Sequence, residues 1–528
     1  MEKRTAASRQ DTGDGQSSSP PEGWPDGGAA EGHGGEPEEE GRLRRRGGLV
    51  AGLVLFAGVL LAPAPEGLTP SAWKTTAVGL LMACWWITEA LPIAATALVP
   101  LVLFPVLGVR SIDAAAAPYA NPLIFLFLGG FVVAVAMQRW NLHRRIALSI
   151  VQRVGTRPQR IVIGFIIASA FLSMWVSNTA TALMMLPIGL SVIDLTRERL
   201  EEGRDPDALN FGIVMVLVIA YACNVGGMGT LIGTPPNALL AGFMSESYGV
   251  EIGFAQWMAL GVPLVLIALP LVYYVLLWIF PLRLDTLPGG EAIITEEMRK
   301  LGAMTTAEKR VALVFGGTAA FWIFRPLLGQ VVPGLSDAGI AMAAALVLFV
   351  IPAGMGEGRR LLNWDEAEEL PWGVLLLFGG GLSLAAAIEE TGLATWIGDG
   401  IGQLGGWPIL AVILLATALI VLLTEITSNT ATTAAFLPIM AAVAISIGQN
   451  PLLLIVPAAL AASCAFMLPV ATPPNAIVYG SGLISIPEMS RAGLWLNVLF
   501  IFVITLTAYT LLGVAFAVEL GEMPAWAG

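Results

Sequence analysis

The sequence repeats itself across two apolar halves. Ser177–Thr181 reads SNTAT, and the same five residues recur at Ser428–Thr432, 251 positions later. Downstream, Thr234–Ala238 reads TPPNA and recurs at Thr472–Ala476, 238 positions later. Ordered pairs of motifs at nearly fixed separation indicate that the chain contains two copies of one structural unit.

The composition places both copies in lipid. Hydrophobic residues make up 56% of the 528-residue chain and charged residues only 12%, about half the share that is usual in soluble domains. The mean hydropathy is +0.77. No soluble core could bury so much apolar surface, so we predict an all-α, polytopic membrane protein. The net charge of −12 argues against nucleic-acid binding.

Eleven segments have the length and apolar character of a transmembrane helix. They are 48–64, 73–90, 93–109, 121–138, 209–232, 255–281, 309–324, 336–352, 372–388, 452–470 and 493–517. The stretches 161–195 and 407–447 are too long for one span, and each has a polar break in its middle. We predict that both are re-entrant hairpins, with the SNT motifs at their tips.

The basic residues orient the chain. With the N-terminus in the cytoplasm, 24 of the 27 Lys and Arg residues fall on the inner side and only Lys74, Arg110 and Arg325 on the outer side. The C-terminus then lies outside, and a bacterial plasma membrane fits this arrangement. Reading either hairpin as a single span would reverse the membrane orientation of all segments that follow it.

Five spans fall in each repeat, and an odd number forces the two repeats into opposite orientations. Inverted repeats with discontinuous helices are typical of secondary transporters. We divide the chain into a disordered acidic cytoplasmic tail (1–46), a first transmembrane helix (47–72), a first inverted repeat (73–281) with its hairpin (161–195), a cytoplasmic linker (282–308), a second inverted repeat (309–517) with its hairpin (407–447), and an extracellular tail (518–528).

The Pro-Pro pairs predict broken helices that line a polar cavity. Pro235 and Pro236 lack amide donors, and Thr234 is pushed out of the helical region. Free amides at helix starts attract anions. Freed carbonyls and Ser, Thr and Asn oxygens suit a hard cation such as sodium. We therefore expect two tips and two breaks to form one midplane site for an anion flanked by cations.

These motifs resemble the signature of the divalent-anion:sodium symporter family, which carries dicarboxylates, citrate or sulfate. The resemblance runs from about residue 48 to 517 and includes the paired SNT tips, the GTPPN and ATPPN breaks, and Trp85–Pro92. It implies an elevator-type homodimer, in which both hairpins and the spans at the breaks move against a scaffold. It also implies about two or more transported sodium ions and no organic cofactor.

The resemblance further implies a set of binding residues. The first sodium would bind at Ser173, Ser177, Asn178 and Gly233, and the second at Thr424, Ser428, Asn429 and Ala471. The substrate carboxylates would meet Asn178, Thr179, Asn429, Thr430, Thr472 and Pro473.

One ionisable residue stands beside this set. Glu425 lies next to the second tip, where an ionisable group is a functional candidate by default. A structural hydrogen-bonding role is favoured over tuning of the sodium field or proton transfer.

We predict sodium-coupled import of small dianions, most plausibly C4 dicarboxylates such as succinate, malate or fumarate. Sulfate or citrate as substrate, anion exchange without net sodium flux and, more remotely, an ion channel stay open. An enzyme is not expected, since the core shows no nucleophile–histidine pair or metal-ligand cluster. The only histidines are His33 and His143, and the three cysteines lack metal-type spacing.

Overall fold

The computed structural model describes residues 36–155, 157–199, 206–284, 290–354, 358–401 and 406–527. Within these ranges the chain is helical, and its only strand-like feature is an isolated bridge between Pro352 and Arg360. Seven of the described helices are long and apolar enough to cross a membrane, and six shorter apolar helices accompany them. The prediction of an all-helical membrane protein is confirmed; the number of spans stays a prediction.

A leading helix, α1 (Glu36–Leu61), precedes the first repeat. The first repeat consists of α2 (Pro70–Thr88), α3 (Ile93–Thr96), α4 (Val99–Leu107), α5 (Ile112–Ala116), η1 (Ala117–Ala120), α6 (Pro122–Arg139), α7 (Leu142–Val154), α8 (Pro158–Ser173), α9 (Asn178–Arg199), α10 (Pro206–Gly227), α11 (Pro235–Tyr248) and α12 (Phe254–Ile279).

After the linker helix α13 (Gly290–Leu301), the second repeat follows the same order. It consists of α14 (Thr306–Leu328), α15 (Asp337–Val350), α16 (Trp364–Ala367), α17 (Trp372–Glu390), α18 (Leu393–Ile401), α19 (Ile409–Thr424), α20 (Asn429–Ser446), α21 (Leu452–Ala462), η3 (Pro469–Ala471), α22 (Pro473–Tyr479) and α23 (Ile486–Phe516). A short turn, η4 (Ala525–Ala527), ends the described chain.

Proline sets the start of many of these helices. It occupies the first or second position of α2, α6, α8, α11 and α22, where its missing amide is not needed and its fixed φ suits a helix. The starts of these five helices could therefore be predicted from proline after a polar residue, whereas Pro326 after Arg325 lies inside α14.

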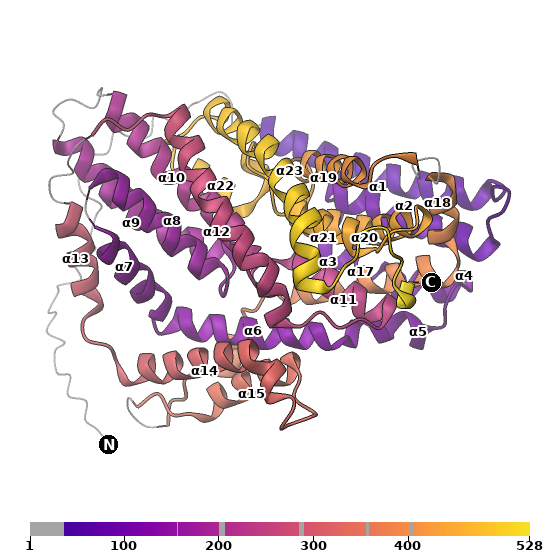
Figure 1. Ribbon diagram of the computed structural model, residues 1–528, viewed down its shortest axis with the longest axis horizontal. Coiled ribbons are helices and arrows are strands. Elements are labelled where there is room, and N and C mark those ends of the chain that lie inside the picture. Colours follow the sequence, from indigo (N-terminus) through magenta and orange to yellow (C-terminus); the bar gives the residue numbers. More distant parts are fainter. Residues whose placement is uncertain are drawn as a thin grey trace, which may run out of the picture.

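The helices form two packed groups that also contact each other, since α17 packs against α11 and α20. In one group α10 packs against α8, α9 and α12, and α21 packs against α19, α20 and α23. In the other, α6 packs along α15, α14 packs on α15, and α17 packs against α2, α3 and α6. In Figure 1, α14 and α15 run below α6, and α8, α9, α10 and α12 lie together on the left.

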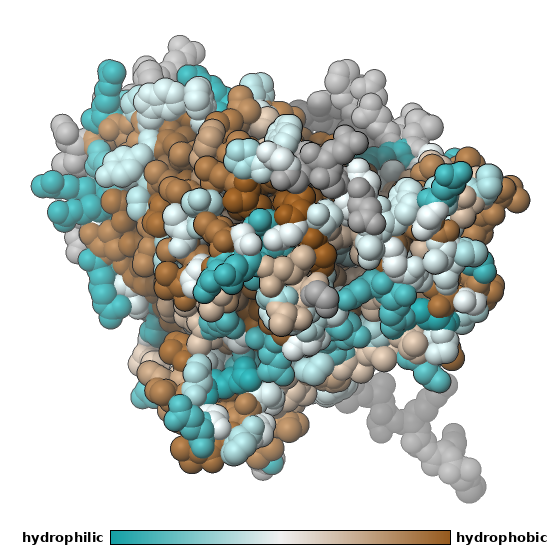
Figure 2. Space-filling view, turned by 45° about the vertical axis from the view of Figure 1, so that its right-hand side comes forward, coloured by the Kyte–Doolittle hydropathy of each residue, from teal (hydrophilic) through white to brown (hydrophobic). Residues whose placement is uncertain are grey.

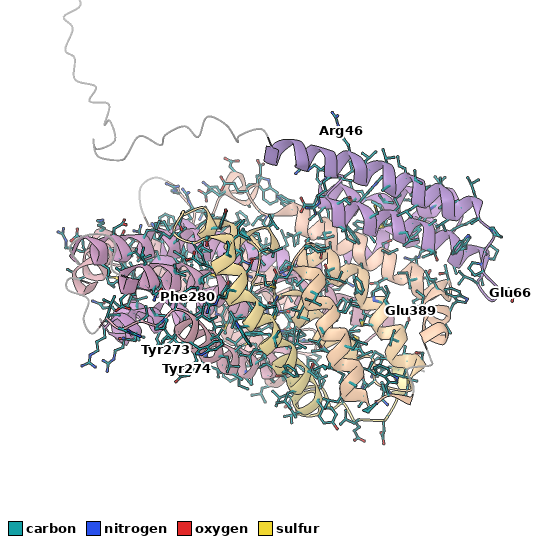
Figure 3. All side chains as sticks on the ribbon, turned by 90° about the horizontal axis from the view of Figure 1, so that it is seen from above. Arg46, Glu66, Tyr273, Tyr274, Phe280 and Glu389 are labelled. Carbon is teal, nitrogen blue, oxygen red and sulfur yellow. The ribbon has the colours of Figure 1, made fainter. Side chains whose placement is uncertain are left out.

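The helices α1 and α2 pack side by side. Figure 3 shows Arg46 near the start of α1 and Glu66 at the opposite end of the pair. The predicted disordered tail is wrong for residues 36–46, because they already belong to α1. Glu and Arg are good helix formers, and the run of glutamates lies at the N-terminal, positive end of the helix. Residues 1–35 of that tail lie outside the described residues.

Much of the surface is apolar, as Figure 2 shows. Large exposed side chains include Leu313 on α14 and Val350 on α15, which are 77% and 66% exposed. Water-soluble monomers rarely expose such broad apolar areas, so these faces fit contact with lipid or with another membrane chain.

The linker between the repeats holds a helix that the sequence reading missed. The helix α13 packs on α7 and contacts α9. Arg144 on α7 pairs with Glu297 on α13. The hydrogen bond to Lys300 and the neighbouring Arg144 hold the pKa of Glu297 below its usual range.

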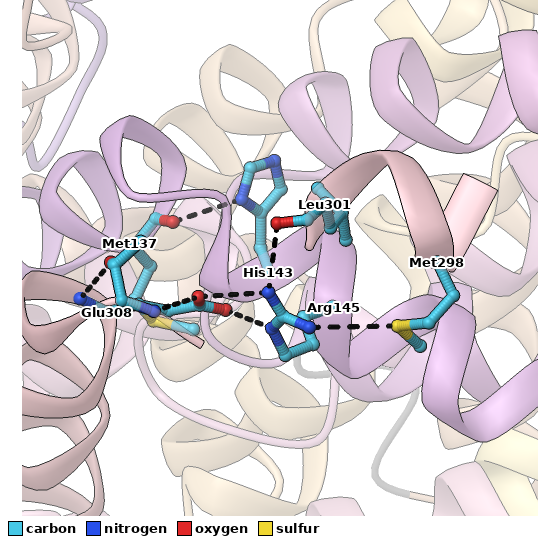
Figure 4. A network of polar contacts seen from close by, with 7 residues as sticks. Met137, His143, Arg145, Met298, Leu301 and Glu308 are labelled. Carbon is cyan, nitrogen blue, oxygen red and sulfur yellow. Dashed lines mark hydrogen bonds and ion pairs between the residues drawn. The ribbon is translucent and has the colours of Figure 1, made fainter. Parts of the chain in front are cut away.

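Arg145 joins the same region to the start of α14 (Figure 4). Its guanidinium pairs with both carboxylate oxygens of Glu308, at 3.1 Å for Oε2, and lies 3.5 Å from the carbonyl oxygen of Leu301. Glu308 is only 2% exposed and closes a capping box with Thr305. His143 Nδ1 lies 3.1 Å from the carbonyl oxygen of Met137, and burial lowers the pKa of this imidazole.

Removing the Arg145 guanidinium tests how much its ion pair with Glu308 stabilises the protein. Arg145→Ala leaves the buried carboxylate of Glu308 without its cation, so we expect a loss of about 1.5–3 kcal/mol, the worth of hydrogen bonds to a charged group. The measurement is the melting temperature of purified protein in detergent. Arg299→Ala is the matched control, because Arg299 pairs with Glu296 on an exposed helix face. An equal loss in both variants contradicts the special role of Arg145.

Candidate functional site

Both SNT motifs lie where two helices meet at a tight turn. The helix α8 ends at Ser173 and α9 begins at Asn178, and α19 ends at Thr424 and α20 begins at Asn429. The four-residue turns are thus placed identically with respect to the motif. The structure describes two helix–turn–helix units at 161–195 and 407–447; that they re-enter the membrane from one side stays a prediction.

In each repeat, a polar side chain of the tip contacts the broken helix of the same repeat: Asn178 in the first and Thr424 in the second. The amide of Asn178, oriented to satisfy its neighbours, donates to the carbonyl oxygens of Gly233 and Cys223, both at 3.3 Å, and also contacts Ser173. In the second repeat, Thr424 Oγ1 lies 2.7 Å from Asn429 Oδ1 and 2.8 Å from the carbonyl oxygen of Ala462.

The breaks themselves follow Gly227 and Ala462, where α10 and α21 end. Residues 228–234 and 463–472 leave the α-helical path before α11 and α22 begin at the Pro-Pro pairs. Their carbonyl and amide groups need other partners, because unpaired backbone groups are costly away from water.

The asparagine of each TPPN motif supplies partners for these loops. Asn237 Nδ2 donates to the carbonyl oxygens of Gly227 and Thr230, at 3.2 and 2.8 Å. Asn475 Nδ2 donates to those of Ala465 and Leu468, at 3.0 and 3.1 Å.

The donor asparagine and the two acceptor residues of the first break each lie 238 positions before their counterparts in the second break. The same pattern of hydrogen bonds therefore braces both loops. The sequence reading used TPPN only as a helix breaker and missed this role of the asparagines. The recurrence of Asn after Pro-Pro in both repeats was the signal that could have revealed it.

A glycine on the following helix lets each loop pack closely. A Cβ on Gly261 would lie 2.6 Å from the carbonyl oxygen of Met228, and one on Gly493 would lie 2.3 Å from that of Phe466. Both loops therefore rest backbone to backbone on α12 or α23.

The second break has a further partner that the first one lacks. The carboxylate of Glu425 accepts hydrogen bonds from the backbone amides of Phe466, Met467 and Leu468, at 2.8 to 3.2 Å. The amide of Asn497 on α23 donates to the same carboxylate, at 2.6 Å. At the equivalent place in the first repeat, 251 positions earlier, stands Met174. These contacts agree with the structural role that we favoured for Glu425.

The helix that follows each break packs against helices of the other repeat. The helix α22 of the second repeat packs against α9 and α10, whereas α11 of the first packs against α20 and α21. Two side chains of α10 bond directly to the second break. Tyr221 donates to the carbonyl oxygen of Phe466 at 2.7 Å, and Asn224 Nδ2 lies 3.2 Å from Thr472 Oγ1. Tips and breaks of both repeats thus belong to one packed unit.

The predicted binding residues differ in burial. Ser173 and Thr424 are fully buried, and Gly233, Ala471 and Thr472 are also buried. The residues at the first turns of α9 and α20 are half-buried: Asn178, Thr179, Asn429 and Thr430. Ser177 and Pro473 are exposed and Ser428 is half-buried.

The structure brings together Ser173, Asn178 and Gly233 around the first tip, and Thr424 and Asn429 at the second. Ser177 accepts from the amide of Ala180 at the start of its own helix, at 3.3 Å. Among the described residues, the side chain of Ser428 makes no hydrogen bond to another predicted site residue.

Oxygen atoms dominate both tips. The described residues hold no group of three or more His, Cys, Asp or Glu side chains that could bind a metal. Hydroxyl, amide and carbonyl oxygens are the ligands expected of a hard monovalent cation rather than of zinc or iron.

Comparison with known proteins gives a consistent result. The family model described as the sodium:sulfate symporter transmembrane region matches residues 44–515. A sodium-dependent dicarboxylate transporter SdcS of Staphylococcus saprophyticus is 47% identical over 470 residues, covering 88% of this chain and 91% of its own. The protein of the same name from Staphylococcus aureus is 43% identical over 481 residues, covering 90% and 92%.

Two solved structures share the fold at low sequence identity. The YdaH transporter of Alcanivorax borkumensis is 16% identical with a TM-score of 0.50, covering 91% of this chain and 98% of its own. MtrF of Neisseria gonorrhoeae is 11% identical with a TM-score of 0.51, covering 89% and 94%.

The close backbone packing at the second break can be tested with a methyl group. We expect Gly493→Ala to destabilise the protein by about 1–3 kcal/mol, because the new Cβ must displace the backbone of Phe466. The measurement is the melting temperature in detergent. Gly316→Ala is the control, since a Cβ there would meet no atom within 4 Å. An unchanged melting temperature for Gly493→Ala contradicts the packing described above.

Proposed function

The chain belongs to the sodium:sulfate symporter family, and from this premise we propose that it imports small dianions together with sodium ions. The dicarboxylate transporters that it resembles at 43–47% identity support dicarboxylates as the substrate class. Within that class we propose C4 dicarboxylates such as succinate, malate or fumarate. The observation that carries the proposal is the pair of oxygen-lined tips, each held against the broken helix of its own repeat.

A first sodium ion would bind at the tip of the first repeat. Ser173 contacts Asn178, and Asn178 contacts the carbonyl oxygens of Gly233 in the first break and of Cys223 on α10. Ser177 completes the proposed set. An ion that binds there would be held by hydroxyl, amide and carbonyl oxygens.

A second ion would bind at the matching place. Thr424 and Asn429 contact each other at the second tip, and Thr424 also contacts the backbone of α21. Ser428 and Ala471 complete this set. We propose at least two sodium ions per transport cycle.

The substrate would lie between the two tips, on the half-buried residues. Asn178, Thr179, Asn429 and Thr430 stand at the starts of α9 and α20, where free amides and the helix dipole favour negative charge. Thr472 and Pro473 would add a contact from the start of α22. The predicted set contains no Lys or Arg, so the bound sodium ions and the helix starts would supply the positive field. This dependence is the physical reason for coupling.

The movement that we propose is of the elevator type. The group formed by α8–α12 and α19–α23 would move against the group formed by α1–α6 and α14–α17. The amphipathic helices α7 and α18 connect the two groups in the chain. We further propose that two copies form a homodimer, and that the N-terminus lies in the cytoplasm and the C-terminus outside.

The test is uptake of labelled succinate into proteoliposomes. With an inward sodium gradient we expect saturable uptake that disappears when potassium replaces sodium. Citrate and sulfate are tested as competitors, because the family description itself names sulfate. Uptake that requires internal substrate but no sodium would indicate an exchanger, and a non-saturating current would indicate a channel. Either result contradicts the proposal.

Asn178→Ala and Asn429→Ala are the informative variants in the same assay. Each removes a side chain that we assign to both sodium and substrate. Losing a hydrogen bond to a charged group costs about 1.5–3 kcal/mol, or roughly 10- to 150-fold in affinity, so uptake should nearly vanish. Asn210→Ala is the matched control, since Asn210 lies at the end of α10 away from the break and donates to the carbonyl oxygen of Pro281. Normal uptake by either tip variant rules out that assignment.

A further inference from the structure

Asn224 is a buried polar residue that belongs to neither proposed sodium set nor to the proposed substrate contacts. It lies on α10, close to the first break, and is 1% exposed. Its counterpart in the second repeat, 238 positions later, is Ala462. The side chain is therefore one of the places where the two repeats differ in chemistry.

The amide of Asn224 reaches across to the second repeat. Its Nδ2 lies 3.2 Å from Thr472 Oγ1 and 3.4 Å from Asn475 Oδ1. Thr472 also caps α22, because the backbone amide of Asn475 donates to the same Oγ1 at 3.3 Å. Two N–H donors thus converge on one hydroxyl oxygen.

This convergence fixes the direction of the hydroxyl. A threonine hydroxyl has two acceptor lone pairs and one proton to donate. With both lone pairs facing N–H donors, the remaining proton must point to an acceptor elsewhere. Thr472 is therefore held as a hydrogen-bond donor. Anions such as carboxylates accept hydrogen bonds and donate none when ionised, so they match a hydroxyl held in this way.

The first break lacks this arrangement. Thr234 makes no side-chain capping bond, and Ala462, the counterpart of Asn224, has no side-chain amide to donate. Asn237 Oδ1, the counterpart of the acceptor on Asn475, has no hydrogen-bond partner among the described residues. The polarity of the hydroxyl is thus imposed at one break only.

We propose that Asn224 is a positioning residue that holds the Thr472 hydroxyl as a donor toward a carboxylate of the substrate. The inference rests on the proposed function, in which Thr472 contacts the dianion. It assigns the two breaks different tasks, since only the second carries a hydroxyl set to donate to the anion. It also means that α10, a helix of the first repeat, contributes to the affinity for substrate through the second break.

The experiment is a double-mutant cycle on substrate binding. Equilibrium binding of labelled succinate is measured at saturating sodium for the wild type, Asn224→Ala, Thr472→Val and the double variant. We expect Asn224→Ala to weaken succinate binding by about 5- to 10-fold, the equivalent of one hydrogen bond of roughly 1–1.4 kcal/mol. Because both changes remove the same donor, the double variant should be no weaker than Thr472→Val alone.

Sodium binding separates positioning from general damage. The rise of the melting temperature with sodium alone should stay unchanged in Asn224→Ala, because Asn224 belongs to neither proposed sodium set. Asn224→Leu, which keeps the side-chain volume, is measured alongside so that a packing defect in the alanine variant does not decide the outcome. Thr472→Ser keeps the hydroxyl. Its affinity for succinate should therefore be close to that of the wild type and higher than that of Thr472→Val.

Tyr221→Phe is the matched control. Tyr221 lies on the same helix and also bonds to the second break, but to the carbonyl oxygen of Phe466 and not to Thr472. Its effect should therefore add to that of Thr472→Val. Additive effects for Asn224, or no loss of affinity in either Asn224 variant, overturn the inference while the wild type still binds succinate. A wild type that binds neither succinate, citrate nor sulfate with sodium present contradicts the proposed function as well.

Discussion

The structure depends on satisfying backbone groups where two helices are interrupted inside an apolar protein. A helix satisfies its own amides and carbonyls, but each Pro-Pro break leaves several of them without partners. Asn237 and Asn475 bind the orphaned carbonyls of the two loops in the same way, and Glu425 binds the amides of the second. These side chains therefore supply partners for backbone groups that the helices no longer satisfy.

The same constraint also shapes the surroundings of the two tips. Once the loops are braced, some carbonyl oxygens still face the tips, beside the hydroxyl and amide groups of Ser173, Asn178, Thr424 and Asn429. Such oxygens are weak ligands one by one and suit a cation that must bind and leave. The packing of α22 against α9 and of α11 against α20 places both tips within one packed unit.

The repeats are similar in backbone and different in chemistry. Glu425 and Asn497 support the second break, whereas Met174 stands where the glutamate would be in the first. Asn224 contacts the second break, whereas Ala462 stands at its equivalent. Pseudo-symmetry accounts for the shared brace, and these departures from it allow the two halves to hold different partners.

The sequence by itself determined the membrane environment, the repeat, the two tips and the two breaks. These features follow from local chemistry: apolar length, the missing amides of proline, and motifs that recur at fixed separation. Even so, the tail prediction was wrong for residues 36–46, which extend α1, and the helix α13 in the linker was missed. Short amphipathic or charged segments carry little of this local information, so their helices are harder to predict from sequence.

Only the tertiary structure decided which side chains satisfy the breaks. The bonds from Glu425 to residues 466–468, from Tyr221 to Phe466 and from Asn224 to Thr472 join positions that lie 41 to 248 apart in the sequence. No local pattern marks such pairs, because a hydrogen bond between distant residues exists only when packing brings donor and acceptor to within about 3 Å at a suitable angle.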